Sequence, residues 1–256
     1  MGTPLFDLAG KVAIATGGNG GIGLGMARGL ADAGAAIAVV GRNEAKSADA
    51  VAELQQRGAK AIAVAADVTD GRAVAEMVAR VKGELGRIDI LVNNAGINIR
   101  KPPHALDIGE WDSVIATNLT SAFLCSRTAY PHLKRAGGGK IINIGSMMSI
   151  FGASFAPAYG SSKGGIVQLT RSLAVAWAPD HIQVNAVLPG WIDTDLTRAA
   201  RVLVAGLHER VLARTPAGRW GTGDDLGGIA VFLASAASDF ITGTAIPVDG
   251  GYSVQG

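Results

Sequence analysis

Short apolar runs alternate with helical patterns along almost the whole chain, and this alternation limits the folds open to it. Seven runs rich in Val, Ile and Ala, each bounded by Gly, Asp or Asn, predict buried strands over residues 11–16, 36–40, 61–65, 88–93, 139–144, 183–188 and 244–248. The stretches between them carry apolar residues at helical spacing and predict helices over residues 22–33, 44–57, 72–83, 110–136, 159–178 and 224–234. Repeated strand–helix units predict a doubly wound α/β fold, with a seven-stranded parallel sheet and helices on both faces.

A single domain accounts for the length. The chain has 256 residues, 48% of them hydrophobic, and contains no internal repeat or linker, so we expect one domain over residues 1–256. The least regular segment covers residues 189–220 and carries one helical stretch over residues 203–212. A long irregular segment in a compact domain is usually a lid or a substrate loop, and we predict that role for it.

Composition and charge argue against several classes of protein. The net charge is +2 and the Lys and Arg residues are scattered, so no nucleic-acid partner is expected. Every long apolar run is interrupted within about 18 residues, which argues against a membrane span. The N-terminus lacks a secretory pattern and Cys125 is the only cysteine, which fits a reducing cytoplasm and a cysteine that fills the core. No pattern of metal ligands stands out, and no metal is expected.

A glycine-rich stretch directly follows the first expected strand and opens the first helix. Glycines in this position let the backbone approach a pyrophosphate, and the N–H groups at the helix start supply donors and positive potential. The stretch therefore predicts a phosphate-binding loop for a dinucleotide. The residues expected to bind the cofactor here are Gly17, Asn19, Gly20, Gly21, Ile22 and Gly23.

The end of the second expected strand bears on the choice of cofactor. NAD enzymes usually carry an acid here for the ribose 2′-hydroxyl, and a nearby arginine favours the 2′-phosphate. Gly41 occupies the acidic position and Arg42 and Asn43 follow it, which predicts NADP in preference to NAD. Polar turns after the third and fourth strands are expected to hold the adenine and to let the cofactor lie against the sheet edge, through Asp67, Val68, Asn94, Ala95 and Gly96.

Tyr159 and Lys163 lie four residues apart at the start of an expected helix, a spacing that places both side chains on one face. A free tyrosine has a pKa near 10, so a neighbouring ammonium and an oxidised nicotinamide would be needed to stabilise its phenolate. Ser146 follows the fifth strand, where its hydroxyl could polarise a substrate carbonyl. Asn118 is an unfavourable residue inside a helix, and we expect it to bend that helix and hold a water.

These motifs occur in the order found in the short-chain dehydrogenase/reductase family, which the chain resembles from about residue 8 to residue 252. The resemblance rests on the glycine pattern, the Asn93–Gly96 turn, Pro189-Gly190 and the tetrad of Asn118, Ser146, Tyr159 and Lys163. It implies a Rossmann fold in which Tyr159 is the acid/base, Ser146 orients substrate, Lys163 lowers the tyrosine pKa and binds ribose, and Asn118 holds a proton-relay water. It also implies that Pro189, Gly190, Ile192 and Thr194 contact the nicotinamide, and that the protein is a homotetramer assembled through helices 110–136 and 159–178.

Three segments, residues 93–102, 140–149 and 215–221, are similar to the gluconate 5-dehydrogenase and 2-deoxygluconate 3-dehydrogenase branch of that family. This similarity implies a sugar acid or polyol whose secondary alcohol is interconverted with a ketone. The residues expected to meet substrate are Arg100, His104, Ser146, Met148, Tyr159 and Trp191.

Other functions stay open at this point. An apolar wall around Met148 and Trp191 suits a broad carbonyl reductase for hydrophobic ketones. A 3-oxoacyl-carrier-protein reductase usually presents a basic residue where this chain has Val175, which lowers the weight of that reading. A non-catalytic NADP-binding sensor or scaffold would have no physical need for the tetrad.

Overall fold

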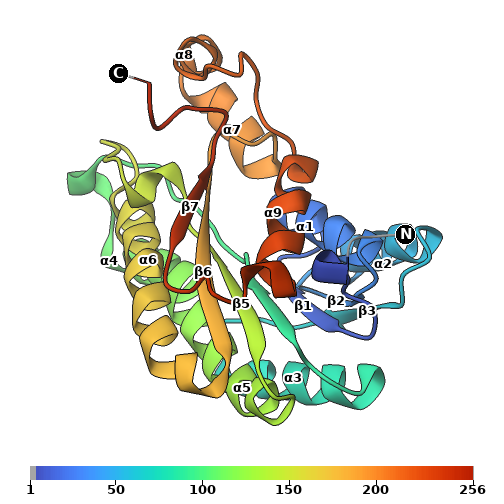
Figure 1. Cartoon of the computed structure of the whole chain (residues 1–256). Helices are drawn as coiled ribbons and strands as arrows, with labels where there is room; N and C mark the ends of the chain where they lie inside the picture. The colour runs from blue at the N-terminus through green and yellow to red at the C-terminus, as the bar shows by residue number, and fades with distance from the viewer. Residues whose placement is uncertain (1–3, 256) are drawn as a thin grey trace.

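Seven parallel strands form one sheet in the order β3-β2-β1-β4-β5-β6-β7 in the computed structural model, which describes residues 4–255 (Figure 1). Strand order reverses between β1 and β4, and in open parallel sheets ligands bind at such a point, outside the carboxyl ends of the strands. The strands are β1 Val12–Thr16, β2 Ala36–Gly41, β3 Ala61–Ala65, β4 Ile90–Asn93, β5 Gly139–Ile144, β6 Ile182–Pro189 and β7 Ala245–Val248. The predicted fold class and all seven strands are confirmed.

Helices cover both faces of the sheet. Against one face pack α1 Gly21–Asp32, α2 Glu44–Gln56 and α9 Gly227–Ala234; against the other pack α3 Gly71–Leu85, α5 Ser121–Arg135 and α6 Pro157–Trp177 (Figure 1). Each face has its own apolar core, because the central strands are buried on both sides and read as continuous Val, Ile and Ala. Cys125 is fully buried in the second core, as its apolar surroundings predicted.

The helix from residue 110 to residue 136 was expected to be continuous, and the structure corrects this. It consists of α4 Ile108–Ile115, a π-helical turn at Ala116–Thr120 and α5. Asn118 lies in the π turn, so the expectation that this residue disturbs the helix is confirmed. Single π turns inside α-helices are frequent at functional sites.

The single helical stretch expected over residues 203–212 is wrong. The segment instead folds into two short helices, α7 Asp195–Leu203 and α8 Leu207–Arg214. The chain turns between them at Gly206, whose φ of 66° lies in the left-handed region that glycine adopts without strain. Both helices bury their apolar sides in a small third core with Trp220, apart from the two sheet cores. No helix within residues 4–255 is long and apolar enough to cross a bilayer.

Candidate active site

Two adjoining cavities open at the carboxyl ends of the strands, beside the point where strand order reverses. Their volumes are about 340 and 330 Å³, and both are lined by Gly17, Asn19, Lys46, Ala95 and Gly96. The first cavity reaches the ends of β5 and β6, whereas the second lies over the ends of β2 and β3. Together they make an elongated cleft across the switch point, the shape that a dinucleotide requires.

The glycine loop lies between β1 and α1, and some of its glycines have no room for a side chain. A Cβ on Gly23 would come within 2.3 Å of the Gly17 carbonyl oxygen and 2.4 Å of Asn94 Nδ2. Gly17 and Gly21 have positive φ angles of 62° and 51°, which few other residues adopt. A bare backbone at a helix N-terminus fits a pyrophosphate, so the residues present suit a dinucleotide cofactor.

Asn94 braces this loop from the neighbouring strand. Its amide donates to the carbonyl oxygens of Thr16 (3.1 Å) and Gly17 (3.0 Å), and its own N–H donates to Thr16 Oγ1 (3.0 Å). The side chain expected to contact cofactor therefore ties the ends of β1 and β4 together. This cross-strand brace holds the phosphate loop in place at the switch point.

The second cavity contains the residues expected at the adenosine end. It is lined by Arg42 and Asn43 after β2 and by Asp67 and Val68 after β3. A Cβ on Gly41 would lie 2.4 Å from Asn19 Nδ2, so the Asn19 side chain occupies the space in which an acid would read the ribose hydroxyls in NAD enzymes. Asp67 Oδ1 accepts hydrogen bonds from the N–H and hydroxyl of Thr69, which lower the pKa of that carboxyl.

The irregular segment after β6 lies over the glycine loop. Thr194 begins α7 as its N-cap, and a Cβ on Gly21 would come within 2.9 Å of Thr194 Cγ2. Pro189, Gly190 and Ile192 line the same side of the first cavity. Residues far apart in the sequence thus enclose the cleft from both sides.

Tyr159 and Lys163 reach the first cavity from the first two turns of α6. Lys163 Nζ lies 5.6 Å from the centre of the Tyr159 ring and donates to the Ile144 carbonyl oxygen at 2.6 Å. Ser146, two residues beyond β5, lines the cavity beside them and caps a short 3-10 turn by accepting from Met148 N. The expected phenol, ammonium and hydroxyl therefore share one site.

Burial dominates the electrostatics of this group. It raises the pKa of Tyr159, while a hydrogen bond from Ser146 and the positive charge of Arg100 act in the opposite direction. Burial also lowers the pKa of Lys163 to about 8. Arg100, a residue expected to bind substrate, thus also acts on the phenol through its charge.

Asn118 lies behind the cavity and not in its lining. Its Oδ1 accepts from Ile97 N at 2.8 Å, and its Nδ2 donates to the Ile97 carbonyl oxygen at 2.9 Å and to Ser162 Oγ at 3.0 Å. Ser162 in turn donates to the Tyr159 carbonyl oxygen at 2.7 Å. Asn118 therefore links the loop after β4 to the helical turn that carries the tyrosine.

Most of the expected site residues line the two cavities, with three exceptions. Gly23 packs beneath the glycine loop, Asn118 is buried behind the site, and His104 is exposed in a short turn away from the lining. Several polar residues that the sequence did not single out also line the cleft, among them Lys46, Asn98, Asp195 and Thr197. Lys46 lies in the first turn of α2, four residues after Arg42, and its closeness to that strand end was a signal that could have identified it.

The chain is similar to known proteins over nearly its whole length. A family model described as enoyl-(acyl carrier protein) reductase matches residues 17–253. The chain is 40% identical over 252 residues to a 2-dehydro-3-deoxy-D-gluconate 5-dehydrogenase from Formosa agariphila, covering 98% of this chain and 96% of the relative. It is 41% identical over 245 residues to a cis-4-hydroxycyclohexanecarboxylate dehydrogenase from Sinomonas cyclohexanicum, covering 95% and 96% of the two chains.

The chain is also similar to a solved structure. The fold superposes on a gluconate 5-dehydrogenase from Burkholderia cenocepacia, crystallised with NADP and tartrate, with a TM-score of 0.94. The two chains are 40% identical, and the match covers 99% of each.

Proposed function

We propose, from the premise that this chain belongs to the short-chain dehydrogenase/reductase family, that it is an NADP-preferring oxidoreductase which interconverts a secondary alcohol and a ketone on a sugar acid or a related hydroxy acid. The observation that supports this most is one cavity in which Ser146, Tyr159, Lys163 and Arg100 meet the glycine loop. A bound nicotinamide would supply the hydride acceptor or donor. The side chains of the cavity would supply the proton and the orientation.

Each polar side chain has a distinct task in the oxidation direction. Ser146 donates a hydrogen bond to the substrate oxygen and fixes its position. Tyr159, as phenolate, removes the hydroxyl proton; in the reverse direction it returns a proton to the alkoxide oxygen. Lys163 holds the ribose hydroxyls and adds positive charge near the phenolate. Asn118 positions this helical turn, and its neighbourhood holds the water that exchanges the proton with solvent.

The substrate end of the cavity suits an anion with hydroxyl groups. Arg100 is half-buried in the cavity lining and its positive charge acts on the Tyr159 phenol, so its guanidinium is suited to pair with a substrate carboxylate held there. Within residues 4–255, Asn98 Oδ1 and Trp191 Nε1 are buried atoms with no hydrogen-bond partner, and both residues line the cavity. The named substrates of the relatives share a carboxylate and a secondary alcohol or ketone.

A second candidate is a less polar substrate. Met148, Phe155 and Trp191 form an apolar wall in the cavity, which suits a cyclic carboxylic acid or a hydrophobic ketone. The relative that acts on cis-4-hydroxycyclohexanecarboxylate supports a carboxylate beside an apolar ring.

A substrate screen tests the proposal. The purified protein is mixed with NADP or NAD and with gluconate, cis-4-hydroxycyclohexanecarboxylate, a neutral polyol or a simple aryl alcohol, and the absorbance of the reduced nicotinamide is followed. We expect turnover with NADP and the carboxylates, and a raised KM for the carboxylates in Arg100→Leu. Turnover of the neutral compounds alone would favour the broad carbonyl reductase, and no turnover with bound cofactor would favour the scaffold.

A further inference from the structure

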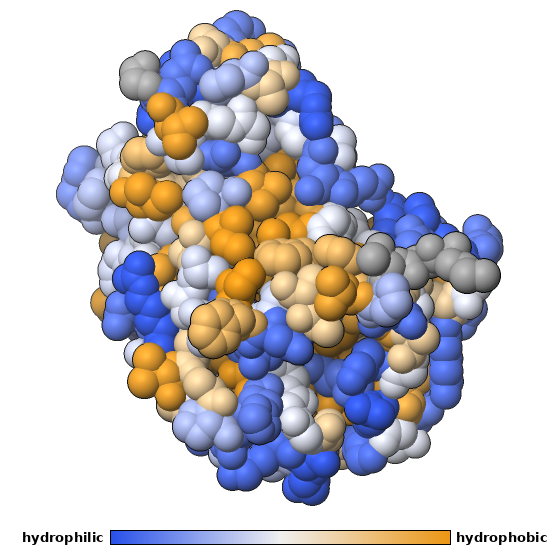
Figure 2. Space-filling view, viewed as in Figure 1, coloured by the Kyte–Doolittle hydropathy of each residue, from blue (hydrophilic) through white to orange (hydrophobic). Residues whose placement is uncertain are grey.

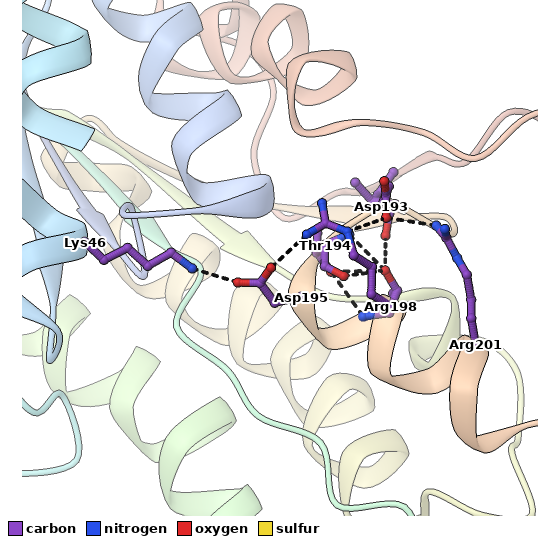
Figure 3. A network of polar contacts seen from close by, with 8 residues as sticks. Lys46, Asp193, Thr194, Asp195, Arg198 and Arg201 are labelled. Carbon is purple, nitrogen blue, oxygen red and sulfur yellow. Dashed lines mark hydrogen bonds and ion pairs between the residues drawn. The ribbon is translucent and has the colours of Figure 1, made fainter. Parts of the chain in front are cut away.

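Lys46 spans the cofactor cleft in a way that the reaction does not require. It belongs to α2, on the adenosine side, and its Nζ lies 2.7 Å from Oδ2 of Asp195, the first residue of α7 on the opposite side (Figure 3). Its side chain lines both cavities of the cleft. The ion pair therefore crosses the place where the two cavities join.

The end of the Lys46 side chain lies close over Gly20. A Cβ on Gly20 would lie 3.0 Å from both Cε and Nζ of Lys46. The φ of Gly20 is 176°, an extended conformation open to any residue, so the backbone does not demand glycine there. A side chain at residue 20 would shift the end of Lys46, so glycine there lets the ammonium lie close to the phosphate loop.

Arg42 faces the same cavity from the end of β2. Within residues 4–255 its guanidinium has no carboxylate partner within 4 Å. Its charge contributes to lowering the pKa of the Asp67 carboxyl. Two cations, one free and one held by a carboxylate, thus border the adenosine end of the cleft.

Asp195 does not depend on Lys46 for a partner. Its other oxygen accepts from Arg198 Nη1 at 2.9 Å, and Arg198 is also paired with Asp193 (Figure 3). The side chains of Lys46 and Asp195 are 45% and 73% exposed, and ion pairs between exposed groups are weak. A phosphate with nearly two negative charges is the stronger partner for an ammonium, and Asp195 would remain paired after the exchange.

We propose that Lys46 is a second cation that reads the 2′-phosphate of NADP, and that Asp195 holds it in place until that phosphate arrives. Arg42 contacts the phosphate from the strand end, and Lys46 contacts it from over Gly20. This inference rests on the proposed function, because it presumes a nicotinamide dinucleotide in the cleft. It adds Lys46 to the residues that decide between NADP and NAD. It also adds a competition between Asp195 and the 2′-phosphate for Lys46, which sets the affinity for NADP.

Direct binding measurements test the proposal without turnover. Dissociation constants of NADPH and NADH are measured by energy transfer from tryptophan to the nicotinamide, and those of adenosine 2′,5′-bisphosphate and 5′-monophosphate by calorimetry. We expect Lys46→Ala to weaken NADPH and the bisphosphate by about tenfold or more, since a charge-assisted hydrogen bond is lost. NADH and the monophosphate should change by less than about twofold, and Lys46→Arg should restore most of the loss.

The partner carboxylate provides the matched test. Asp195→Asn keeps the size of the side chain and removes its charge, so we expect it to tighten NADPH binding severalfold and to leave NADH binding unchanged. Arg42→Ala serves as the reference for a lost phosphate contact. Equal losses of both dinucleotides in Lys46→Ala, or no gain in Asp195→Asn, would overturn the proposal. Failure of the wild-type protein to bind either dinucleotide would instead refute the proposed function.

Discussion

At the scale of single residues, the proposed proton transfer depends on whether the Tyr159 phenol is protonated. The surroundings of Tyr159 change its pKa in opposite directions. Burial raises the pKa, whereas a hydrogen bond from Ser146 and the charge of Arg100 lower it. Lys163 donates a hydrogen bond to the Ile144 carbonyl oxygen, and burial lowers its own pKa to about 8. The protein alone therefore keeps the phenol protonated near neutral pH, and a positively charged nicotinamide would be needed to lower its pKa further.

Removing the phenol oxygen should abolish the proton transfer and little else. We expect Tyr159→Phe to lower kcat by at least about a hundredfold, the usual scale for a positioned acid/base. The dissociation constant of NADPH, measured in the same preparation, should stay within about threefold of the wild-type value. Turnover close to that of the wild type would contradict the assignment.

The pH dependence of alcohol oxidation reports on the same phenol. Oxidation needs the phenolate, so its rate should rise with pH through the pKa of Tyr159, which burial raises. Because the charge of Arg100 lowers that pKa, Arg100→Leu should move the rise in kcat to higher pH, and Arg100→Lys should move it back.

The measurement is kcat against pH at saturating cofactor and alcohol. A variant that only loses substrate affinity would raise KM and leave the midpoint where it was. An unchanged midpoint in Arg100→Leu would therefore show that Arg100 acts on the substrate and not on the phenol.

At the scale of elements, the π turn between α4 and α5 joins the loop after β4 to α6, the helix that carries Tyr159. It places the Asn118 amide against both backbone groups of Ile97 and against Ser162, which binds the Tyr159 carbonyl oxygen. The irregular turn therefore serves a hydrogen-bond network that crosses three segments. A regular helix would present the amide at a different angle.

Loss of the Asn118 amide should affect both stability and rate. Asn118→Ala leaves the Ile97 N–H without its acceptor in a partly buried site, so we expect the free energy of unfolding in urea to fall by about 1–3 kcal/mol. kcat should fall as well, because the turn that carries Tyr159 loses a support. Thr120→Ala, an exposed change in the same turn, is the control and should leave both quantities unchanged.

At the scale of the whole molecule, apolar surface remains where the fold has no layer to cover it. Figure 2 shows apolar residues gathered over β7 and α9, at the edge of the sheet. On the other side, Phe123 on α5 is 41% exposed and Val175 on α6 is 81% exposed. Patches of this kind often mark contacts between subunits. The mean hydropathy of +0.30 is consistent with such contacts.

We predict a homotetramer in which α5 and α6 of different subunits pack together. Light scattering after size exclusion should give about four times the mass of the 26.0 kDa chain. Val175→Glu should shift the mass toward a smaller assembly, because it places a charge in the expected contact. A monomeric wild-type protein would refute the prediction.

The sequence by itself determined the strands, the glycine loop and the pair of Tyr159 and Lys163. These features depend on local patterns: a buried strand must be continuously apolar, a phosphate loop must be free of side chains, and four residues make about one helical turn. It also indicated the substrate class through similarity of short segments. The boundaries of α1, α2, α3 and α6 agree with the predictions to within about two residues.

Only the tertiary structure decided the features that depend on contacts between distant segments. The π turn exists around an amide that meets a loop 21 residues away, and the break at Gly206 allows α7 and α8 to fold over a third core. In the sequence Lys46 is an ordinary exposed helix residue. Its partner Asp195 lies 149 residues further along the chain, and only the fold places α7 across the cleft from it. Local sequence carries no record of such partners, because they meet only when the sheet places its strand ends side by side.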